Sequence, residues 1–128
     1  MSITEFQIYR MNIVSALKKA GIKENNIFFN KDTIPVSFPS AFVVLELETG
    51  ILKTSKRYLD SKFSFVIYLI ISSEKAKDPD SEILILKEAF RVEYQLLLKK
   101  DFVKVEYYNA RADAGRKVKI ACITTETE

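Results

Sequence analysis

The chain of 128 residues contains no histidine and a single cysteine. Without histidine, neither a Ser-His-Asp nor a Cys-His catalytic arrangement can form, and the HExxH motif and other histidine-containing zinc sites are excluded. Cys122 cannot form an internal disulfide, so the fold depends on packing, with association as a further source of stability, and a reducing compartment is expected. Much of the common chemistry of enzymes is therefore ruled out.

Glycine is scarce as well. The only three glycines, Gly21, Gly50 and Gly115, lie far apart in the chain. A P-loop or a GxGxxG dinucleotide fingerprint needs several glycines within a few residues. We therefore expect no nucleotide cofactor, and the sequence indicates no other cofactor.

Long hydrophobic runs and a strong charge imbalance are also missing. The apolar run Phe63 to Ile71 is far shorter than the roughly 20 residues that span a bilayer, and the segment Met1 to Ala20 is amphipathic, so we expect no membrane segment or secretion signal. Twenty basic residues against 17 acidic ones indicate mixed, solvated faces. The 48% hydrophobic fraction predicts one globular domain over residues 1–128, with a short flexible tail from about residue 125.

Two helices are predicted from their termini. Ser2 and Glu5 form a capping-box pattern, apolar residues then recur at helical spacing, and Gly21 can end the helix, which predicts a helix from Ser2 to Ala20. The second helix begins after Asp78 and Pro79 and runs to about Lys100. Its predicted core stripe consists of Ile83, Leu86, Phe90 and Leu97.

Three strands are predicted between Ala41 and Ser72. Residues 41–47 alternate with Ala41, Val43, Leu45 and Leu47 on the apolar side, residues 51–58 form an exposed hairpin arm, and residues 63–71 are apolar on both faces. A strand that is apolar on both faces must be covered on both sides. A short edge strand is expected at residues 27–29.

Two more strands close the chain. The first has Val103, Val105 and Tyr107 inward, and it is joined through a loop from Asn109 to Gly115 to a last strand with Val118, Ile120 and Cys122 inward. The prediction is an α+β fold with a mainly antiparallel sheet of about five strands and two long helices, in the order α-β-β-β-α-β-β.

Candidate catalytic and metal-binding residues are few. Cys122 lies on an apolar strand face without a histidine to activate it, so we interpret it as a core residue. Asp78, Asp80 and Glu82 have the spacing of a calcium-loop start, but the glycine and the distant glutamate of such a loop are missing, and helix capping is favoured.

One enzymatic alternative stays open. Nucleases of the restriction-endonuclease type place acidic metal ligands on adjacent strands together with an acid-x-Lys triplet, and Glu46 or Glu48 with Asp60, Ser61 and Lys62 has that pattern. Magnesium and a metal-activated water would be its chemistry. The triplet falls at an expected turn, where an aspartate beside a lysine is common, so the nuclease hypothesis is the less favoured one.

Basic residues gather at two places. One cluster comprises Lys53, Lys56, Arg57 and Lys62 with Tyr58 among them, and the other comprises Arg111, Arg116, Lys117 and Lys119. Both could contact phosphates or an RNA base, which leaves a small nucleic-acid-binding module as a further alternative. Lysines that protect a solvated hairpin arm from edge pairing are the more common reason for such a cluster.

The element order resembles the tail terminator, or tail-completion, proteins of long-tailed bacteriophages, including neck and minor capsid proteins of similar build. The resemblance covers residues 1–125. It rests on the opening helix, the proline-led strand 38–44, the basic residues 56–58 that lead into residues 63–67, the second helix and the closing hairpin.

This resemblance implies a non-enzymatic virion protein of a phage or prophage, present in the host cytoplasm during assembly. Its expected form is a ring, usually of six subunits, that caps the tail tube, ends its polymerisation and joins it to the head. Tail-tube and head-connector proteins are then the expected partners. The two basic clusters, and not the resemblance, supply the candidate interface contacts: Lys53, Lys56, Arg57, Tyr58, Lys62, Arg111, Arg116 and Lys117.

Physical reasoning agrees in one respect. Two helices on one side of the sheet leave the second face of strand 63–71 to another chain or to the protein's own loops. The alternative is a monomer in which the two helices straddle the sheet, one on each face.

Overall fold

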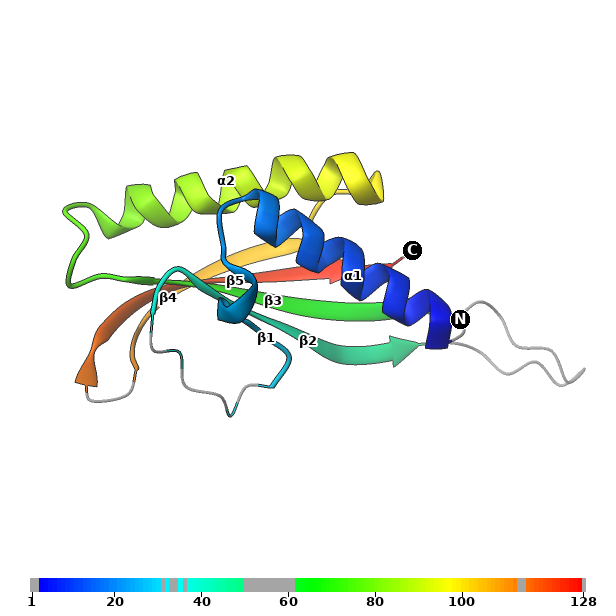
Figure 1. Ribbon diagram of the computed structural model, residues 1–128, viewed down its shortest axis with the longest axis horizontal. Helices are drawn as coiled ribbons and strands as arrows, with labels where there is room; N and C mark the ends of the chain where they lie inside the picture. The colour runs from blue at the N-terminus through cyan, green and yellow to red at the C-terminus, as the bar shows by residue number, and fades with distance from the viewer. Residues whose placement is uncertain are drawn as a thin grey trace, which may run out of the picture.

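The computed structural model describes residues 3–30, 32, 35, 37–49, 62–112 and 115–127. The elements, in chain order, are α1 (Ile3–Lys19), the short 3-10 helix η1 (Glu24–Asn26), β1 (Ile27–Phe28), β2 (Ser40–Thr49), β3 (Lys62–Ser72), α2 (Pro79–Leu98), β4 (Lys104–Arg111) and β5 (Lys117–Glu126). The predicted α+β fold with two helices is confirmed (Figure 1).

The described strands form one sheet in the order β1-β2-β3-β5-β4. Only β1 and β2 run parallel, and the other three pairings are antiparallel. β3 is central, as its two apolar faces predict, and the expected short edge strand is present as β1. The predicted hairpin arm at residues 51–58 lies outside the described residues.

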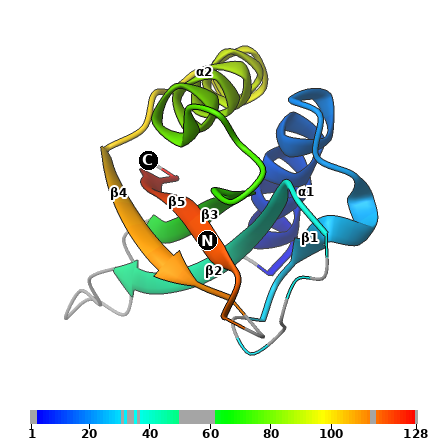
Figure 2. The ribbon, with the colours of Figure 1, turned by 90° about the vertical axis from the view of Figure 1, so that its left-hand side faces the viewer.

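Both helices pack on the same face of the sheet (Figures 1 and 2). One core cluster unites residues of α1 and α2 with one face of β2, β3 and β5. Its fully buried side chains include Leu17, Ile67, Phe90, Tyr94 and Ile123. The arrangement in which the helices straddle the sheet is therefore wrong, because α1 and α2 contact each other and share one core.

Local chemistry explains where the helices end. Beyond α1, the N–H of Gly21 donates to the carbonyl of Lys18 (3.1 Å) and the N–H of Ile22 to the carbonyl of Leu17 (3.1 Å), a Schellman pattern in which Gly21 takes φ 109°. At the start of α2, Asp78 accepts hydrogen bonds from the hydroxyl and the N–H of Ser81, which lower the pKa of Asp78.

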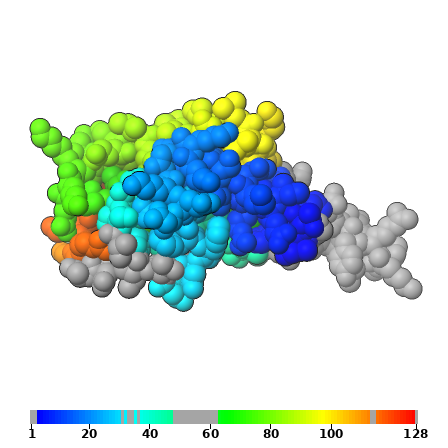
Figure 3. All heavy atoms as spheres, viewed as in Figure 1, coloured from blue at the N-terminus to red at the C-terminus, as the bar shows by residue number. Residues whose placement is uncertain are grey.

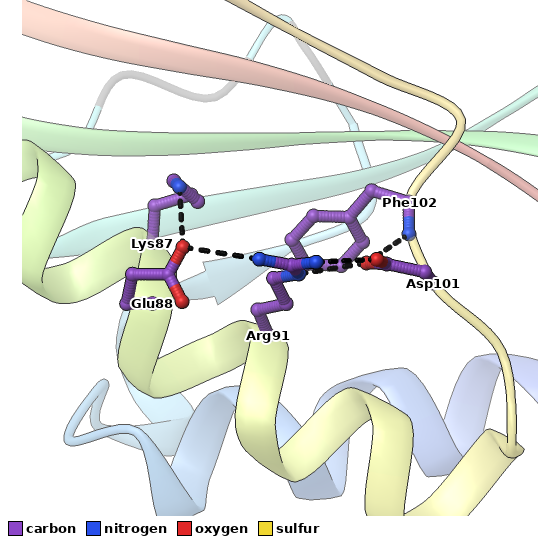
Figure 4. A network of polar contacts seen from close by, with 5 residues as sticks. All are labelled: Lys87, Glu88, Arg91, Asp101 and Phe102. Atoms are coloured by element: carbon purple, nitrogen blue, oxygen red, sulfur yellow. Dashed lines mark hydrogen bonds and ion pairs between the residues drawn. The ribbon is translucent and has the colours of Figure 1, made fainter.

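A network of charged side chains fastens the middle of α2 to the segment that leads into β4 (Figure 4). Glu88 pairs with Lys87 (2.6 Å) and with Arg91 (3.4 Å), and Arg91 also contacts Asp101. Asp101 in turn accepts a hydrogen bond from the backbone N–H of Phe102 at 2.7 Å. The ring of Phe102 is thereby placed against the aromatic residues of the core.

The alternation predicted for β2 is correct only up to its bulge. Between Leu45 and Leu47 the register shifts, so that Leu47 lies opposite Ser64 while Glu48 lies opposite the core residue Phe63. An extra residue in a strand moves the following side chains to the other face. Leu47 is consequently on the other face and 54% exposed, while Leu45, still opposite Phe65 just before the bulge, is 43% exposed instead of buried.

The expected inward faces of the last two strands need correction. Ala121 and Ile123 of β5 face the helices, whereas Cys122 lies on the opposite face, where it is nevertheless buried. In β4, Val105 packs against the core, but Val103 just before the strand is 57% exposed and Tyr107 is 38% exposed, because β4 is an edge strand that the helices do not fully cover.

Pairing also extends further along the chain than predicted. β4 continues through Asn109 to Arg111, so much of the expected loop from Asn109 to Gly115 is paired with β5. At the other end, β5 runs to Glu126, and Thr127 is buried and exchanges hydrogen bonds with Phe63 at 2.8 and 2.9 Å. Residues 125 and 126 are therefore part of β5, and Thr127 is bonded to β3, where a flexible tail was expected.

Candidate functional site: the outer sheet face and the open edges

The sheet has a second face, turned away from α1 and α2, which we call the outer face. Opposed residues in antiparallel strands share a face, so the register assigns its members. Its apolar and aromatic residues are Phe42, Val44, Leu47, Val66, Tyr68, Ile70, Tyr108, Ala110, Val118, Ile120 and Cys122. A sheet that is apolar on both faces has two surfaces to cover, and the helices cover one.

The protein's own loops close one end of the outer face. Phe28 and Phe38 pack with Phe42, Ile70 and Val118 in a second, smaller core cluster. These contacts make this end of the outer face part of the folded core.

Arg116 anchors that end. Its guanidinium lies 5.2 Å from the ring centre of Phe38 and donates a hydrogen bond of 2.7 Å to the carbonyl of Pro35. Asn26 donates to the carbonyl of Pro39 at 3.2 Å, which holds the same loop from the other side. Arg116, predicted as a partner contact, thus has a structural role within the chain.

Two side chains of the outer face stay exposed among the described residues. Leu47, opposite Ser64 near the other end of the face, is 54% exposed, and Tyr108, opposite Ile120 on the edge strand β4, is 41% exposed. A hydrogen bond with the Cys122 thiol raises the pKa of Tyr108 to about 12. Cys122 is therefore a buried neighbour of Tyr108, which agrees with its interpretation as a packing residue.

Two strand edges are also open within the described part of the chain. β4 pairs only with β5, so its other edge is unpaired from Lys104 to Arg111. On the opposite side of the sheet, β1 pairs with β2 only at Ala41 and Phe42, which leaves the edge of β2 from Val43 onward unpaired. Unpaired N–H and C=O groups of this kind are templates for pairing with another chain.

The second basic cluster lies at one end of the β4–β5 hairpin. Arg111 and Lys117 are opposed across the two strands and both are exposed. Arg111 donates to the carbonyl of Gly115 at 3.2 Å, and Lys119 is paired with Asp80 at 2.9 Å. Arg111 and Lys117 are therefore the members of this cluster whose side chains are most exposed to a partner.

The first basic cluster cannot be placed in the same way. Its members Lys53, Lys56, Arg57 and Tyr58 lie outside the described residues, and Lys62 is described only as the first residue of β3, opposite Thr49.

The structure describes only some of the residues of the nuclease pattern. Glu46 lies exposed at the bulge of β2, and Asp60 and Ser61 lie outside the described residues. Over residues 3–49 and 62–127, as far as they are described, no three carboxylate or cysteine side chains are grouped so that they could hold a metal ion.

A pocket of about 690 Å³ lies between the N-terminal half of α2 and the loop before β2. Its charged residues are Glu74, Lys75, Glu82 and Arg116. Glu74 accepts a hydrogen bond from the N–H of Lys117 at 2.6 Å, and Arg116 is bonded to Pro35. Two of the four charged residues of the pocket are therefore bonded to other segments of the chain.

No protein-family model matches the chain, and no curated protein sequence matches it either. Among the described helices, none is both long and apolar enough to cross a membrane. The candidate site is therefore defined by its surface alone: an apolar outer face on which Leu47 and Tyr108 are exposed, two open strand edges and an exposed basic pair.

Proposed function

We propose that the protein is a non-enzymatic subunit of a homo-oligomeric ring that terminates the tail tube of a long-tailed phage or prophage and joins it to the head. The observation that carries the proposal is the placement of both helices on one face, which leaves the outer face and two different strand edges available to neighbouring chains. The sequence resemblance supplies the biological setting, with a hexamer as the expected ring.

The two open edges favour a cyclic assembly. The edge of β4 and the distal edge of β2 are on opposite sides of the sheet and differ in sequence. Contact between two different surfaces is head-to-tail, and it forms a closed ring when the rotation between neighbours closes. Strand pairing across such a contact would satisfy the backbone groups that the edges expose.

The outer face favours the same arrangement. Leu47 and Tyr108 belong to the two strands whose edges are open, and both are partly exposed. A neighbour paired along either edge would lie next to one of these side chains. The exposed basic residues Arg111 and Lys117 at the hairpin would then be available to a further partner such as the tail tube.

The first test is the mass and shape of the assembly. Light scattering with negative-stain electron microscopy, at increasing protein concentration, is expected to show closed rings with six subunits. A monomer without rings at high concentration would refute the ring.

The second test addresses the role in the tail. Added to a polymerising tail-tube protein of the same phage or prophage, the chain is expected to stop elongation at a defined end. If rings formed but tube growth were unchanged, the ring assembly would stand and the role as a tail terminator would be refuted.

A further inference from the structure

Helix α2 carries a second apolar stripe on the side opposite its core residues. Ile85, Val92 and Leu96 are 69%, 52% and 61% exposed, whereas Ile83 and Phe90 on the core side are at most 1% exposed. Such exposure means that no described segment packs over the stripe. We call this stripe, with the charged residue at each of its ends, the α2 seam: Glu82, Ile85, Ala89, Val92, Leu96 and Lys99.

The spacing of the α2 seam is that of a helix-packing surface. Its steps alternate between three and four residues from Glu82 to Lys99, as the a and d positions of a heptad do. A stripe with this spacing drifts slowly around the helix, so it stays in contact with a partner helix along its whole length. The packing of α2 against the sheet uses other residues of the helix, so it does not account for the apolar residues of the seam.

The position of α2 leaves the seam accessible. Figures 1 and 2 show α2 lying beside α1 in the helical layer, with its far side turned away from the sheet, and in the space-filling view the surface of α2 lies beside that of α1 (Figure 3). The exposed side chains of the seam can thus be reached by a partner that is itself a helix, and its N-terminal residues Glu82, Ile85 and Ala89 also line the pocket described above.

We propose that the α2 seam is covered by a second copy of the chain, with the two α2 helices antiparallel about a two-fold axis. In this register, Ile85 faces Leu96 of the second copy and Ala89 faces Val92. The midpoint of each pair falls between residues 90 and 91, so a single axis satisfies both pairs. The small side chain of Ala89 lets the helices approach closely at the axis.

Charge complementarity selects this occupant and this direction. The same axis places Glu82, at the N-terminal end of the seam, opposite Lys99 of the second copy, and both side chains are exposed. A parallel pair would instead set Glu82 against Glu82 and Lys99 against Lys99. The antiparallel pair also brings the positive end of each helix dipole next to the negative end of the other.

This contact goes beyond the proposed ring and does not rest on it. A two-fold contact uses the same surface on both chains and closes at two copies, whereas a ring contact joins two different surfaces. The seam is on the helical layer, on the opposite side of the sheet from the outer face. The dimer and the ring can therefore be tested separately.

A charge exchange tests the pairing. Glu82→Lys and Lys99→Glu should each weaken the dimer about tenfold in sedimentation velocity at low salt, because each change creates two like-charge contacts. The chain with both substitutions should recover the original affinity, and the two single variants, when mixed, should form a heterodimer. If neither the doubly substituted chain nor the mixture of single variants formed the dimer, the proposed pairing would be refuted.

Cysteine cross-linking tests the register. A chain with Ile85→Cys and Leu96→Cys should form a covalent dimer on mild oxidation. Ile85→Cys alone should not, because the two copies of that position would lie about 16 Å apart along the helices. The unsubstituted chain, with its buried Cys122, is the background control. Efficient cross-linking of the single variant would overturn the antiparallel register.

An apolar variant separates the dimer from other occupants and from the ring. Val92→Glu should abolish the dimer, while Leu84→Glu, an exposed position of α2 outside the seam, should not. Any sheet-mediated ring should survive Val92→Glu. A chain that is monomeric at all concentrations, or that binds lipid vesicles through Val92 as a monomer, would overturn the proposal.

Discussion

The guanidinium of Arg91 in α2 donates to both carboxylate oxygens of Asp101, from Nε to Oδ1 at 2.8 Å and from Nη2 to Oδ2 at 2.5 Å (Figure 4). Fork-shaped pairing of this kind is stronger and more directional than a single contact. Hydrogen bonding to Arg91 lowers the pKa of Asp101. Because the two residues are ten positions apart, the pair fixes how the chain turns from α2 into β4.

We expect Arg91→Met to lower the melting temperature by a few degrees at pH 7. Since the pKa of Asp101 is depressed in the folded chain, the stabilisation is present above its unfolded value of about 3.9 and is lost as the pH falls through the folded value. The variant should therefore lose less stability than the parent below pH 4.

Thermal melts from pH 2.5 to 7 check this. The matched control is Lys104→Met, because Lys104 forms only an exposed pair with Glu106. Equal effects of Arg91→Met and Lys104→Met would contradict the role given to the pair.

Tyr94 provides a second prediction. It is 1% exposed and its ring lies 5.8 Å from that of Phe90 and 5.1 Å from that of Phe102. Tyr94→Ala should cost about 3–5 kcal/mol, because it leaves a cavity in the core. Tyr94→Phe keeps the ring and should cost only about 1 kcal/mol for the lost hydrogen bond with Thr125.

The alkaline response of Tyr94 has a definite sign. Burial raises its pKa to about 12 in the folded chain, from about 10 when unfolded. The associated stability is complete below pH 10 and is lost as the pH rises to 12. Urea denaturation at pH 8 and pH 11 should show a smaller loss for Tyr94→Phe than for the parent, and no such difference for the exposed Tyr107→Phe. If the parent and both variants lost the same stability between pH 8 and pH 11, the stabilising role of neutral Tyr94 would be contradicted.

Gly21→Ala is the third prediction. No atom lies within 4 Å of the position where a Cβ would be, but φ of 109° is unfavourable for any residue with a side chain. We expect a loss of about 1–2 kcal/mol in denaturant titration. Lys19→Ala, two residues earlier in the helix, should change stability by less than about 0.5 kcal/mol. If Gly21→Ala left the free energy of unfolding unchanged, the chain would not depend on the positive φ at position 21 to end α1.

The proposed ring gives a prediction at the outer face. Leu47→Glu and Tyr108→Glu should each prevent ring formation in light scattering, because they place a charge at the contact. Their melting temperatures should stay within a few degrees of the parent, since both side chains are substantially exposed. Leu84→Glu on α2 is the control that should leave rings unchanged. Rings that form with both outer-face variants would exclude this face as the interface.

The basic clusters give the last prediction. Replacing Lys53, Lys56 and Arg57 by alanine, or Arg111 and Lys117, should weaken partner contacts and flatten their dependence on salt. Binding measured at salt concentrations from about 50 to about 500 mM, over which the screening of exposed charges increases strongly, checks this. Assembly that is unchanged in strength and salt dependence would show that these charges are only solvated.

Local signals in the sequence located the two helices and the central strand. Asp78 with Pro79 and the glycine at position 21 mark helix ends through bonds to neighbouring residues, and the two apolar faces of β3 require a central place in any sheet. Tyr94 was missed as a core residue, although it lies four residues after Phe90. The exposed stripe of α2 was missed as well, although its heptad spacing is present in the sequence.

The remaining features depend on contacts between distant segments. The bulge after Leu45 moves Leu47 to the outer face, and it is set by pairing with β3. Likewise, Cys122 and Ile123 are both apolar, so alternation alone does not reveal which of them faces the helices.

By itself, the sequence determined that histidine-based sites and glycine-rich nucleotide motifs are missing, where the helices begin and end, and that strand 63–71 needs cover on both faces. Each of these follows from residue types and near-neighbour spacing. Only the tertiary structure decided that both helices cover the same face. That choice depends on the shared core of α1, α2 and the sheet, and it leaves the outer face, two strand edges and the α2 seam available to other chains.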